Sequence, residues 1–361
     1  MRRSLQLGLS ILPFLLSACS QPVRPTPPPA QVAPVAAAPL PIAAGSVSTA
    51  GPDLASPLLS AEKRAAFISE TAAASGMTPA EIAGWLDQAR YQQSIINAIT
   101  RPAEGKPWKD YRPIFLTETR ISQGRQFIAE HREELARVSA QSGVPAEIFV
   151  AIIGVETSYG RIMGNYRVLD ALYTLGFFFP RREEFFRGEL KNLFTLAKKE
   201  GLDLATLKGS YAGAMGWGQF MPSSYLEYGR DGDGDGRRDL RGSTRDAFAS
   251  VANYFAGHGW KTGQPAFVPA IADPGAAPFV PADFVARYSL ADLAARGYRP
   301  RDAGAPQLPA TLLTLEGVNG PEYWIGYPNF YVITRYNRSP MYAMAVHQLA
   351  GEIAAGVGPA P

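Results

Sequence analysis

The sequence predicts a mainly α (α+β) protein in which a small β-rich region interrupts a helical body. Helical periodicity dominates residues 61–264, where Thr78 and Glu81 have the capping-box spacing of a helix start, with a proline between them. In residues 265–331 the composition changes to Pro, Gly and β-formers, and "TLLTLEG", "YWIGYP" and "NFYVITRYN" are predicted as strands. Residues 332–361 return to helical periodicity in "PMYAMAVHQLAGEIAAG".

The first segment, residues 1–18, has the pattern of an export signal. Arg2 and Arg3 precede an apolar run that is too short for an ordinary membrane span, and "LSAC" ends at Cys19. This tetrapeptide resembles the lipobox at which bacterial lipoproteins are cleaved and acylated, which implies a lipid anchor at Cys19. Ser20, rather than Asp, resembles the outer-membrane version of the signal and implies the periplasmic face of a Gram-negative outer membrane. The alternative is a secreted protein whose cysteine falls there by chance.

The second segment, residues 19–60, is rich in Pro and Ala and nearly uncharged, as in "RPTPPPAQVAPVAAAPLP". It cannot bury enough apolar surface to fold, so we expect a disordered tether. Proline keeps such a chain extended at about 3 Å per residue, which gives a reach on the order of 100 Å. An inert linker of no required length is an equal alternative.

The composition of the whole chain narrows the function classes. Its 361 residues, 46% of them hydrophobic, suit one large or two small domains with a substantial core. Basic and acidic residues nearly balance at a formal charge of +3, which gives nucleic-acid binding little support. One cysteine excludes an intramolecular disulfide, and with only three histidines there is little material for a zinc site or a thiol nucleophile.

A single carboxylate, Glu156, stands in the otherwise apolar stretch "AEIFVAIIGVETSYG". If this stretch is one helix ending at Gly160, Glu156 continues an apolar stripe at positions i, i+3, i+4 and i+7. The other members of the stripe are Phe149, Ile152 and Ile153. Burial would raise the pKa of Glu156 and let it give a proton to a leaving group, as a glycosidic general acid does. The alternative is a helix-end glutamate that bonds a backbone group or pairs with Arg161.

Five long motifs share their order with one enzyme family: "ETSYG", "LYTLGFFFPRREEFF", "GSYAGAMGWGQFMPSSY", "SVANYFAGHGW" and "YPNFYVITRYNRSPMYAMAVHQL". They closely resemble the lytic murein transglycosylase B family of outer-membrane lipoproteins, and the resemblance covers most of the chain from about Tyr111 onward. It implies a lysozyme-like helical catalytic core with an additional helical region. It also implies that Glu156 is the acid and base that cleaves peptidoglycan glycan strands.

The same resemblance implies a set of substrate-binding residues. Ser210 and Gln219 would line the cleft near Glu156, with Ser210 contacting the N-acetyl group of the cleaved muramoyl residue. Arg181 and Arg182 would contact the acidic stem peptide, although such a pair is usually a solvated face. Aromatic rings that could stack on sugars, and one amide, complete the set: Tyr111, Tyr254, Tyr336 and Asn337. Each ring taken alone is more often core packing.

The expected reaction needs only one carboxylate. Hydrolytic glycosidases usually need two, and no motif marks a second, although Asp170 and Glu183 follow within reach in sequence. The resemblance implies cleavage of the MurNAc-β-1,4-GlcNAc bond with 1,6-anhydroMurNAc ends and no catalytic cofactor. The implied partners are glycan strands and stem peptides, with cell-wall synthesis complexes as further candidates. A wall-binding lipoprotein without catalysis and a muramidase that releases reducing ends stay open, while a wall amidase or peptidase has less support.

The segment "DGDGDG" matches the first half of an EF-hand calcium loop, with carboxylates at positions one, three and five and glycine at six. The second half departs from this pattern because Gly242 occupies position twelve, where a glutamate is expected, and Arg238 replaces an apolar residue. The resemblance implies a longer loop closed by Asp246, whose rival role is a capping box with Ser243. The predicted ligands of a structural Ca²⁺ are Asp231, Asp233, Asp235, the Arg237 carbonyl and Asp246.

Overall fold

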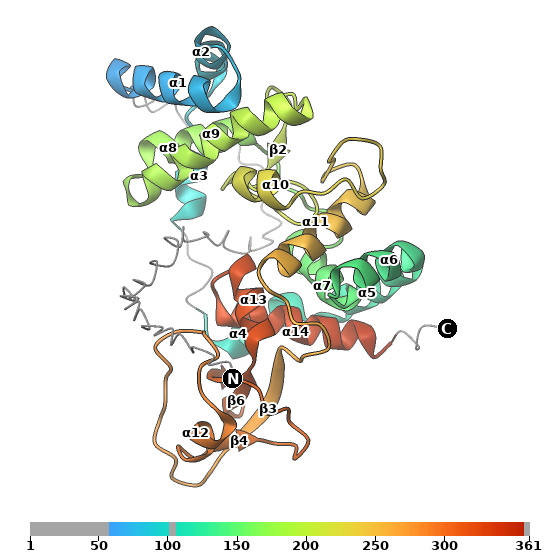
Figure 1. Ribbon diagram of the computed structural model, residues 1–361. Helices are drawn as coiled ribbons and strands as arrows, with labels where there is room; N and C mark the ends of the chain where they lie inside the picture. Colours follow the sequence, from blue (N-terminus) through green and yellow to red (C-terminus); the bar gives the residue numbers. More distant parts are fainter. Residues whose placement is uncertain (1–57, 101–105, 357–361) are drawn as a thin grey trace, which may run out of the picture. The chain divides into compact units, whose positions relative to one another are not determined.

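The computed structural model describes residues 58–100 and 106–356, which all belong to one unit, Val35–Pro361 (Figure 1). The predicted signal, Cys19 and most of the tether lie outside the described residues. The helices are α1 (Ala61–Ser75), α2 (Pro79–Gln88), α3 (Gln93–Ile99), α4 (Trp108–Phe115), α5 (Glu118–Glu130), α6 (Arg132–Ser142), α7 (Ala146–Thr157), α8 (Val168–Phe178), the 3₁₀ turn η1 (Pro180–Arg182), α9 (Glu183–Glu200), α10 (Pro222–Tyr228), α11 (Thr244–Gly257), α12 (Leu290–Ala294), α13 (Pro328–Tyr336) and α14 (Pro340–Ala354). The strands are β1 (Tyr166–Arg167), β2 (Lys208–Gly209), β3 (Phe267–Ala272), β4 (Tyr298–Pro300), β5 (Thr311–Gly317) and β6 (Gly320–Gly326).

Local sequence signals set several of the helix starts. At the start of α2, the Thr78 hydroxyl accepts from Glu81 N at 3.2 Å, and Glu81 Oε2 accepts from Thr78 N at 2.6 Å. The predicted capping box is therefore confirmed. Ser243 and Ser339 cap α11 and α14 with one hydrogen bond each, which the serine hydroxyl accepts from Asp246 N and from Tyr342 N.

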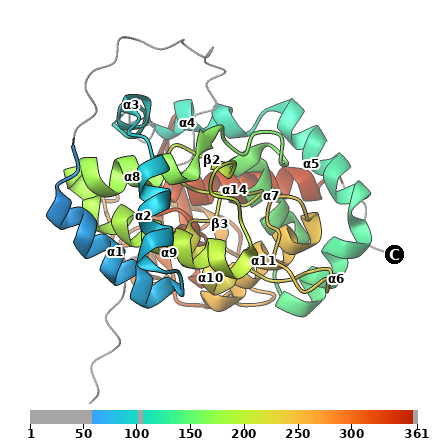
Figure 2. The same cartoon turned by 90° about the horizontal axis from the view of Figure 1, so that it is seen from above.

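The centre of the helical body is the pair α7 and α14. Every residue of α7 from Ile148 to Thr157 is buried, and α14 packs against α7, α5 and α4 (Figure 1). Around this pair, α8 and α9 lie side by side, and α1 packs on α9 with α2 beside it (Figure 2). Because the α7–α14 contact is buried, a polar group there needs a hydrogen-bond partner within the protein.

A four-stranded antiparallel sheet with the order β4-β3-β6-β5 lies in the predicted β-rich region. β5 and β6 form a hairpin that closes at Gly317 and Gly320. The sheet joins the helical body where α4 packs on β5 and α13 on β6. The helix that carries Tyr111 therefore lies between the sheet and α14.

The strand prediction for "NFYVITRYN" is wrong, because this stretch forms α13. Val332, Ile333 and Thr334 favour strands by propensity, but propensity is weak beside tertiary packing. Proline at the first helical position is compatible with a helix start. The buried residues cover more than half of the circumference of the helix, and they are Asn329, Phe330, Val332, Ile333 and Thr334.

In the described ranges, no single helix is both long and apolar enough to cross a membrane. The pair α6 and α7, which bends by 113°, passes that test together on length and composition alone. Most of α7 is buried in the protein core.

Candidate active site

Glu156 occupies the last turn of α7 and is only 7% exposed. Its Oε1 accepts a hydrogen bond of 2.6 Å from the Tyr342 hydroxyl on α14. Burial raises the pKa of Glu156 from its ordinary 4.5 to about 7, and the Tyr342 hydrogen bond acts in the opposite direction. A carboxyl group with this pKa can hold a proton at neutral pH and release it during a reaction.

The turn after Glu156 differs from the expectation of one helix ending at Gly160. The helix ends at Thr157, because Ser158, Tyr159 and Gly160 all adopt left-handed backbone conformations, with φ of 50°, 59° and 77°. Two non-glycine residues in this region are unusual and store strain. Contacts hold the turn: Tyr159 Oη donates to Arg120 O at 2.8 Å, and Arg120 Nη2 donates to Ser158 Oγ at 3.3 Å.

The ion-pair alternative for Glu156 is wrong. Arg161 is exposed and donates to Gln123 Oε1 instead. The two carboxylates considered as a second catalytic acid are also engaged elsewhere. Asp170 accepts from Arg90 N at 2.8 Å and from Arg167, and Glu183 pairs with lysine and arginine neighbours at 2.9 and 2.8 Å.

Tyrosines surround the carboxyl group. Burial raises the pKa of the Tyr342 and Tyr336 phenols well above the ordinary value, and the negative charge of nearby Glu156 adds to the rise. The rings of Tyr254 and Tyr336 meet edge to face at 4.8 Å, and Tyr254 Oη donates to Arg335 O at 2.6 Å. Tyr111, on α4, is close enough to Tyr342 to influence its pKa. The three tyrosines predicted from the motifs therefore gather near Glu156, with Asn337 directly after Tyr336.

Tyr342 was missed by the sequence reasoning. It lies in "PMYAMAVHQL" on the apolar side of α14, where an aromatic residue indicates core packing. The available signal was the apolar helical pattern around it, since a phenol buried in a core usually finds a hydrogen-bond partner.

The glycine-rich motif wraps around the end of α7. Thr157 Oγ1 donates to Trp217 O at 2.9 Å, and Tyr336 Oη donates to Gly218 O. A Cβ atom on Gly218 would lie 2.7 Å from Tyr336 Oη, so this close approach requires glycine. Gln219 follows with a φ of 51°, and its Nε2 donates to Gly216 O and Met163 O at 3.0 and 3.2 Å. Its buried Oε1 has no hydrogen-bond partner in the described part of the chain.

Ser210 lies at the start of the glycine-rich motif, directly after β2. β1 pairs with β2, and a Cβ on Gly164 would lie 2.1 Å from Gly209 O, which places Ser210 beside residues 163–164. Ser210 Oγ accepts from Ala214 N at 3.1 Å and Ala212 N at 3.3 Å. With its oxygen accepting twice, the hydroxyl has its own proton left to donate.

The two arginines of the "PRREE" motif, Arg181 and Arg182, are the last two residues of the 3₁₀ turn η1. Arg181 is exposed, whereas the Arg182 guanidinium lies over the rings of Phe185 and Phe186 at 4.6 and 4.8 Å. Burial lowers the pKa of Arg182, and its buried Nη2 has no hydrogen-bond partner among residues 58–100 and 106–356.

In the acidic loop, carboxylate oxygens of Asp231, Asp233 and Asp246 lie within 4.8 Å of one another. Asp246 is 1% exposed and accepts from Gly232 N and Asp239 N at 2.7 and 2.6 Å. Burial raises its pKa, and the charges of Asp233 and Asp231 add to the rise. Asp235 is not part of this group, and its carboxylate accepts from Arg237 N at 2.8 Å. Converging carboxylate oxygens are ligands that suit a hard cation such as Ca²⁺.

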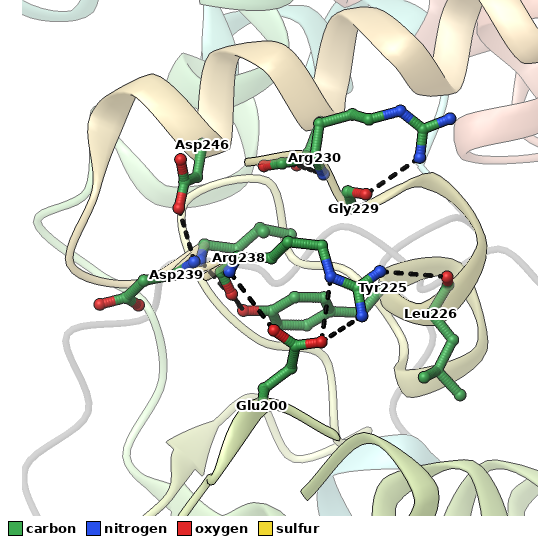
Figure 3. A network of polar contacts seen from close by, with 10 residues as sticks. Glu200, Tyr225, Leu226, Gly229, Arg230, Arg238, Asp239 and Asp246 are labelled. Atoms are coloured by element: carbon green, nitrogen blue, oxygen red, sulfur yellow. Dashed lines mark hydrogen bonds and ion pairs between the residues drawn. The ribbon is translucent and has the colours of Figure 1, made fainter. Parts of the chain in front are cut away.

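Arg238 stands where an EF-hand loop has an apolar residue, and its contacts with α9 and α10 explain why an arginine occurs there (Figure 3). Arg238 Nε donates to Glu200 Oε1 at 3.0 Å, and its backbone N donates to Glu200 Oε2 at 3.3 Å. The Tyr225 hydroxyl donates to Arg238 O and accepts from Leu240 N at 3.1 Å. The loop is therefore fastened to the end of α9 and to α10.

A helical core that buries one carboxyl group among tyrosines, with a pKa suited to proton transfer, is typical of enzymes that cleave glycosidic bonds. The chain belongs to the family described as "Transglycosylase SLT domain", whose model matches residues 60–351. The resemblance recognised in the motifs, the lysozyme-like fold class and the enzyme class are confirmed, and the protein is a lytic transglycosylase.

Individual relatives and solved structures agree with this family assignment. The membrane-bound lytic murein transglycosylase B of Escherichia coli K12 is 48% identical over 247 residues, which are 68% of this chain and 67% of that protein. Among solved structures, lytic transglycosylase SltB1 from Pseudomonas aeruginosa has a TM-score of 0.77 and 49% identity, covering 82% of this chain and 98% of that one. Slt35 from E. coli, in complex with calcium, has a TM-score of 0.74 and 43% identity, covering 81% and 92%. SltB3 from P. aeruginosa, in complex with NAG-anhNAM-pentapeptide, has a TM-score of 0.72 and 32% identity, covering 83% and 81%.

Proposed function

We propose that this transglycosylase cleaves the MurNAc-β-1,4-GlcNAc bond of peptidoglycan with Glu156 as its only acid and base. The observation that carries the proposal is the burial of the Glu156 carboxyl group beside the Tyr342 hydroxyl, since burial raises its pKa to about 7. The other two candidate carboxylates are held in bonds to arginine or lysine. The relative in complex with NAG-anhNAM-pentapeptide supports the substrate class.

The reaction would proceed in two steps. Glu156 gives its proton to the glycosidic oxygen, the C1–O bond breaks, and the substrate's acetamido oxygen supports the positive charge at C1. The C6 hydroxyl of the same sugar then attacks C1, and the Glu156 carboxylate takes the hydroxyl proton. Because this attack is intramolecular, it has an orientation advantage over attack by water. The products are a 1,6-anhydroMurNAc end and a free GlcNAc hydroxyl.

Substrate contacts are proposed for the residues that the family resemblance singles out. The Ser210 hydroxyl would donate to the N-acetyl carbonyl, and the unpartnered Gln219 Oε1 would accept from a sugar hydroxyl or amide. The tyrosine rings and the neighbouring amide would contact the sugars, and these residues are Tyr111, Tyr254, Tyr336 and Asn337. Arg181 and Arg182 would bind carboxylates of the stem peptide.

The products test this proposal. Purified peptidoglycan digested with the full chain is expected to yield muropeptides with anhydro ends, read by mass spectrometry. Reducing MurNAc ends would make the enzyme a muramidase, and intact strands would favour a wall-binding protein instead. Either outcome would overturn the proposed reaction.

The cellular location is proposed in two parts. An envelope-associated protein fits the membrane-bound E. coli relative. Anchoring through lipid on Cys19 at the periplasmic face of the outer membrane is the finer proposal, and it depends on the lipobox resemblance alone. Cell-wall synthesis complexes are candidate partners on the same basis.

We also propose that the acidic loop holds a structural Ca²⁺, as the complex of Slt35 with calcium suggests. Asp231, Asp233 and Asp246 would supply carboxylate oxygens, and the Arg237 carbonyl would be a further ligand. Asp235 lies outside the carboxylate group and would join it only if the loop rearranges. The ion would stabilise the fold and take no part in proton transfer.

Calcium is expected to raise the melting temperature of the protein, since an ion that binds only the folded state stabilises it. EDTA is expected to lower the melting temperature, and an Asp246→Asn variant is expected to lose most of the response to both. Scanning calorimetry with and without each additive measures this. Unchanged melting temperatures in the parent protein would rule out the site.

A further inference from the structure

Glu189, on α9, is a buried carboxylate that the proposed reaction does not use. It is 4% exposed, and both of its oxygens accept from one residue. Ser223 N donates to Oε2 at 2.9 Å, and Ser223 Oγ donates to Oε1 at 2.6 Å. Ser223 lies in the first turn of α10, where a backbone N–H has no partner within the helix. Glu189 therefore fixes the point at which the glycine-rich motif enters α10.

That point is close to the substrate-binding part of the motif. Met215 and Phe220 exchange two backbone hydrogen bonds of 2.9 Å and close a tight loop around Gln219. Ser223 follows Phe220 by three residues. A shift at the start of α10 would therefore move the loop and the Gln219 amide with it.

Arg182 lies on the same side of α9 as Glu189, since its guanidinium lies over Phe186, which precedes Glu189 by three residues. Burial raises the pKa of Glu189, and the two Ser223 bonds and then the positive charge of Arg182 oppose that rise. The Arg182 guanidinium is fixed over Phe185 and Phe186, and its buried Nη2 has no partner within the described ranges. One arginine thus supports a buried carboxylate and still has a donor for a ligand anion.

We propose that Glu189 is a positioning residue that links the stem-peptide arginine, Arg182, to the loop that carries Gln219. The proposal rests on the proposed function, in which Arg182 binds the peptide and Gln219 contacts the sugar. The two Ser223 donors, and then the positive charge of Arg182, favour the ionised form of Glu189, which accepts from both donors and holds the loop. Loss of either charge loosens the loop even when the other residue is intact.

A double-mutant cycle on the full chain tests this link. The variants are Glu189→Gln, Arg182→Gln and the double variant, assayed on peptide-bearing strands and on strands stripped of stem peptides. Glu189→Gln removes the charge and replaces one of the two acceptor oxygens with an NH₂ group that cannot accept from Ser223. It is expected to lower kcat about ten- to hundredfold on both substrates. Arg182→Gln is expected to lower kcat on both substrates and to raise KM only on peptide-bearing strands. The double variant is expected to have a kcat no lower than Glu189→Gln alone.

Controls separate this role from a merely structural one. Glu184→Gln, exposed on the same helix, is expected to leave kcat and KM unchanged. Ser223→Ala removes one of the two bonds and is expected to give a smaller drop in kcat, which serves if Glu189→Gln folds poorly. The link would be overturned if the kcat losses of the two single variants multiplied in the double variant. It would also be overturned if Glu189→Gln had a lower melting temperature and a normal kcat. An equal KM for Arg182→Gln on both substrates would overturn the peptide contact, and a parent protein that cleaves neither substrate would overturn the proposed function itself.

Discussion

Glu156→Gln is expected to lower the release of anhydromuropeptides by about 10⁴-fold, the upper end of what general acid–base catalysis contributes. The loss is large because one side chain gives the proton in the first step and takes one in the second. A glutamine amide is nearly isosteric but does neither. Initial rates on purified glycan strands, with products read by mass spectrometry, measure the loss.

The same substitution is expected to stabilise the fold at alkaline pH. Because the folded-state pKa of Glu156 is raised from 4.5 to about 7, its favourable contribution is present at low pH and is lost as pH rises through about 7. The neutral amide avoids the burial of a charge, so the variant should gain up to about 3 kcal/mol over the parent at pH 8. Below about pH 4.5 this difference should disappear.

Glu147→Gln on the same helix is the matched control. Glu147 lies in the first turn of α7, away from Glu156 at the other end, and its substitution should leave the rate unchanged. A Glu156→Gln enzyme with more than a tenth of the parent rate would contradict the role of Glu156. A variant that is inactive because it is unfolded would show as a lower melting temperature rather than a higher one.

Tyr342→Phe is expected to move the alkaline limb of the pH–rate profile to higher pH by one pH unit or more. The Tyr342 hydroxyl donates to Glu156 Oε1 and favours the ionised carboxylate, so it lowers the pKa against burial. Without this donor the pKa rises further above 7, and the protonated acid persists to higher pH. A hydrogen bond to a charged group is worth about 1.5–3 kcal/mol, which sets the size of the shift.

The maximal rate of Tyr342→Phe is expected to fall about tenfold, because the hydroxyl also fixes the carboxyl group in place. Profiles of kcat and kcat/KM against pH measure both effects. Tyr323→Phe, on β6 in the cluster that packs around Tyr298 and away from Glu156, is the control and should keep the parent profile. An alkaline limb that stays in place or moves to lower pH would contradict the assignment.

Residues of the candidate site differ in how far the sequence could predict them. The burial of Glu156 was predictable from helical spacing, because a carboxylate on an apolar stripe is buried once the helix packs. Its role as the acid came from the motifs. The long motifs supplied the remaining substrate residues through family resemblance. Tyr342 had no such signal, since only the crossing of α14 over α7 brings its hydroxyl to Oε1. The link between Glu189 and Ser223 likewise joins residues 34 positions apart in sequence.

The fold shows the same division. A proline, a hydroxyl cap and a glutamate are enough to start α2, because a capping box needs only neighbours in sequence. "NFYVITRYN" could not be assigned correctly from its β-branched residues, because packing of the helix against the rest of the fold decided its state.

By itself, then, the sequence determined the family, the mainly helical class and the identity of the buried acid, since these depend on local spacing and on motif order. Only the tertiary structure decided which phenol meets Glu156, where α7 ends and which aspartates converge in the acidic loop. Those features depend on contacts between distant segments, and a hydrogen bond or a carboxylate cluster forms only where packing brings the two partners within reach.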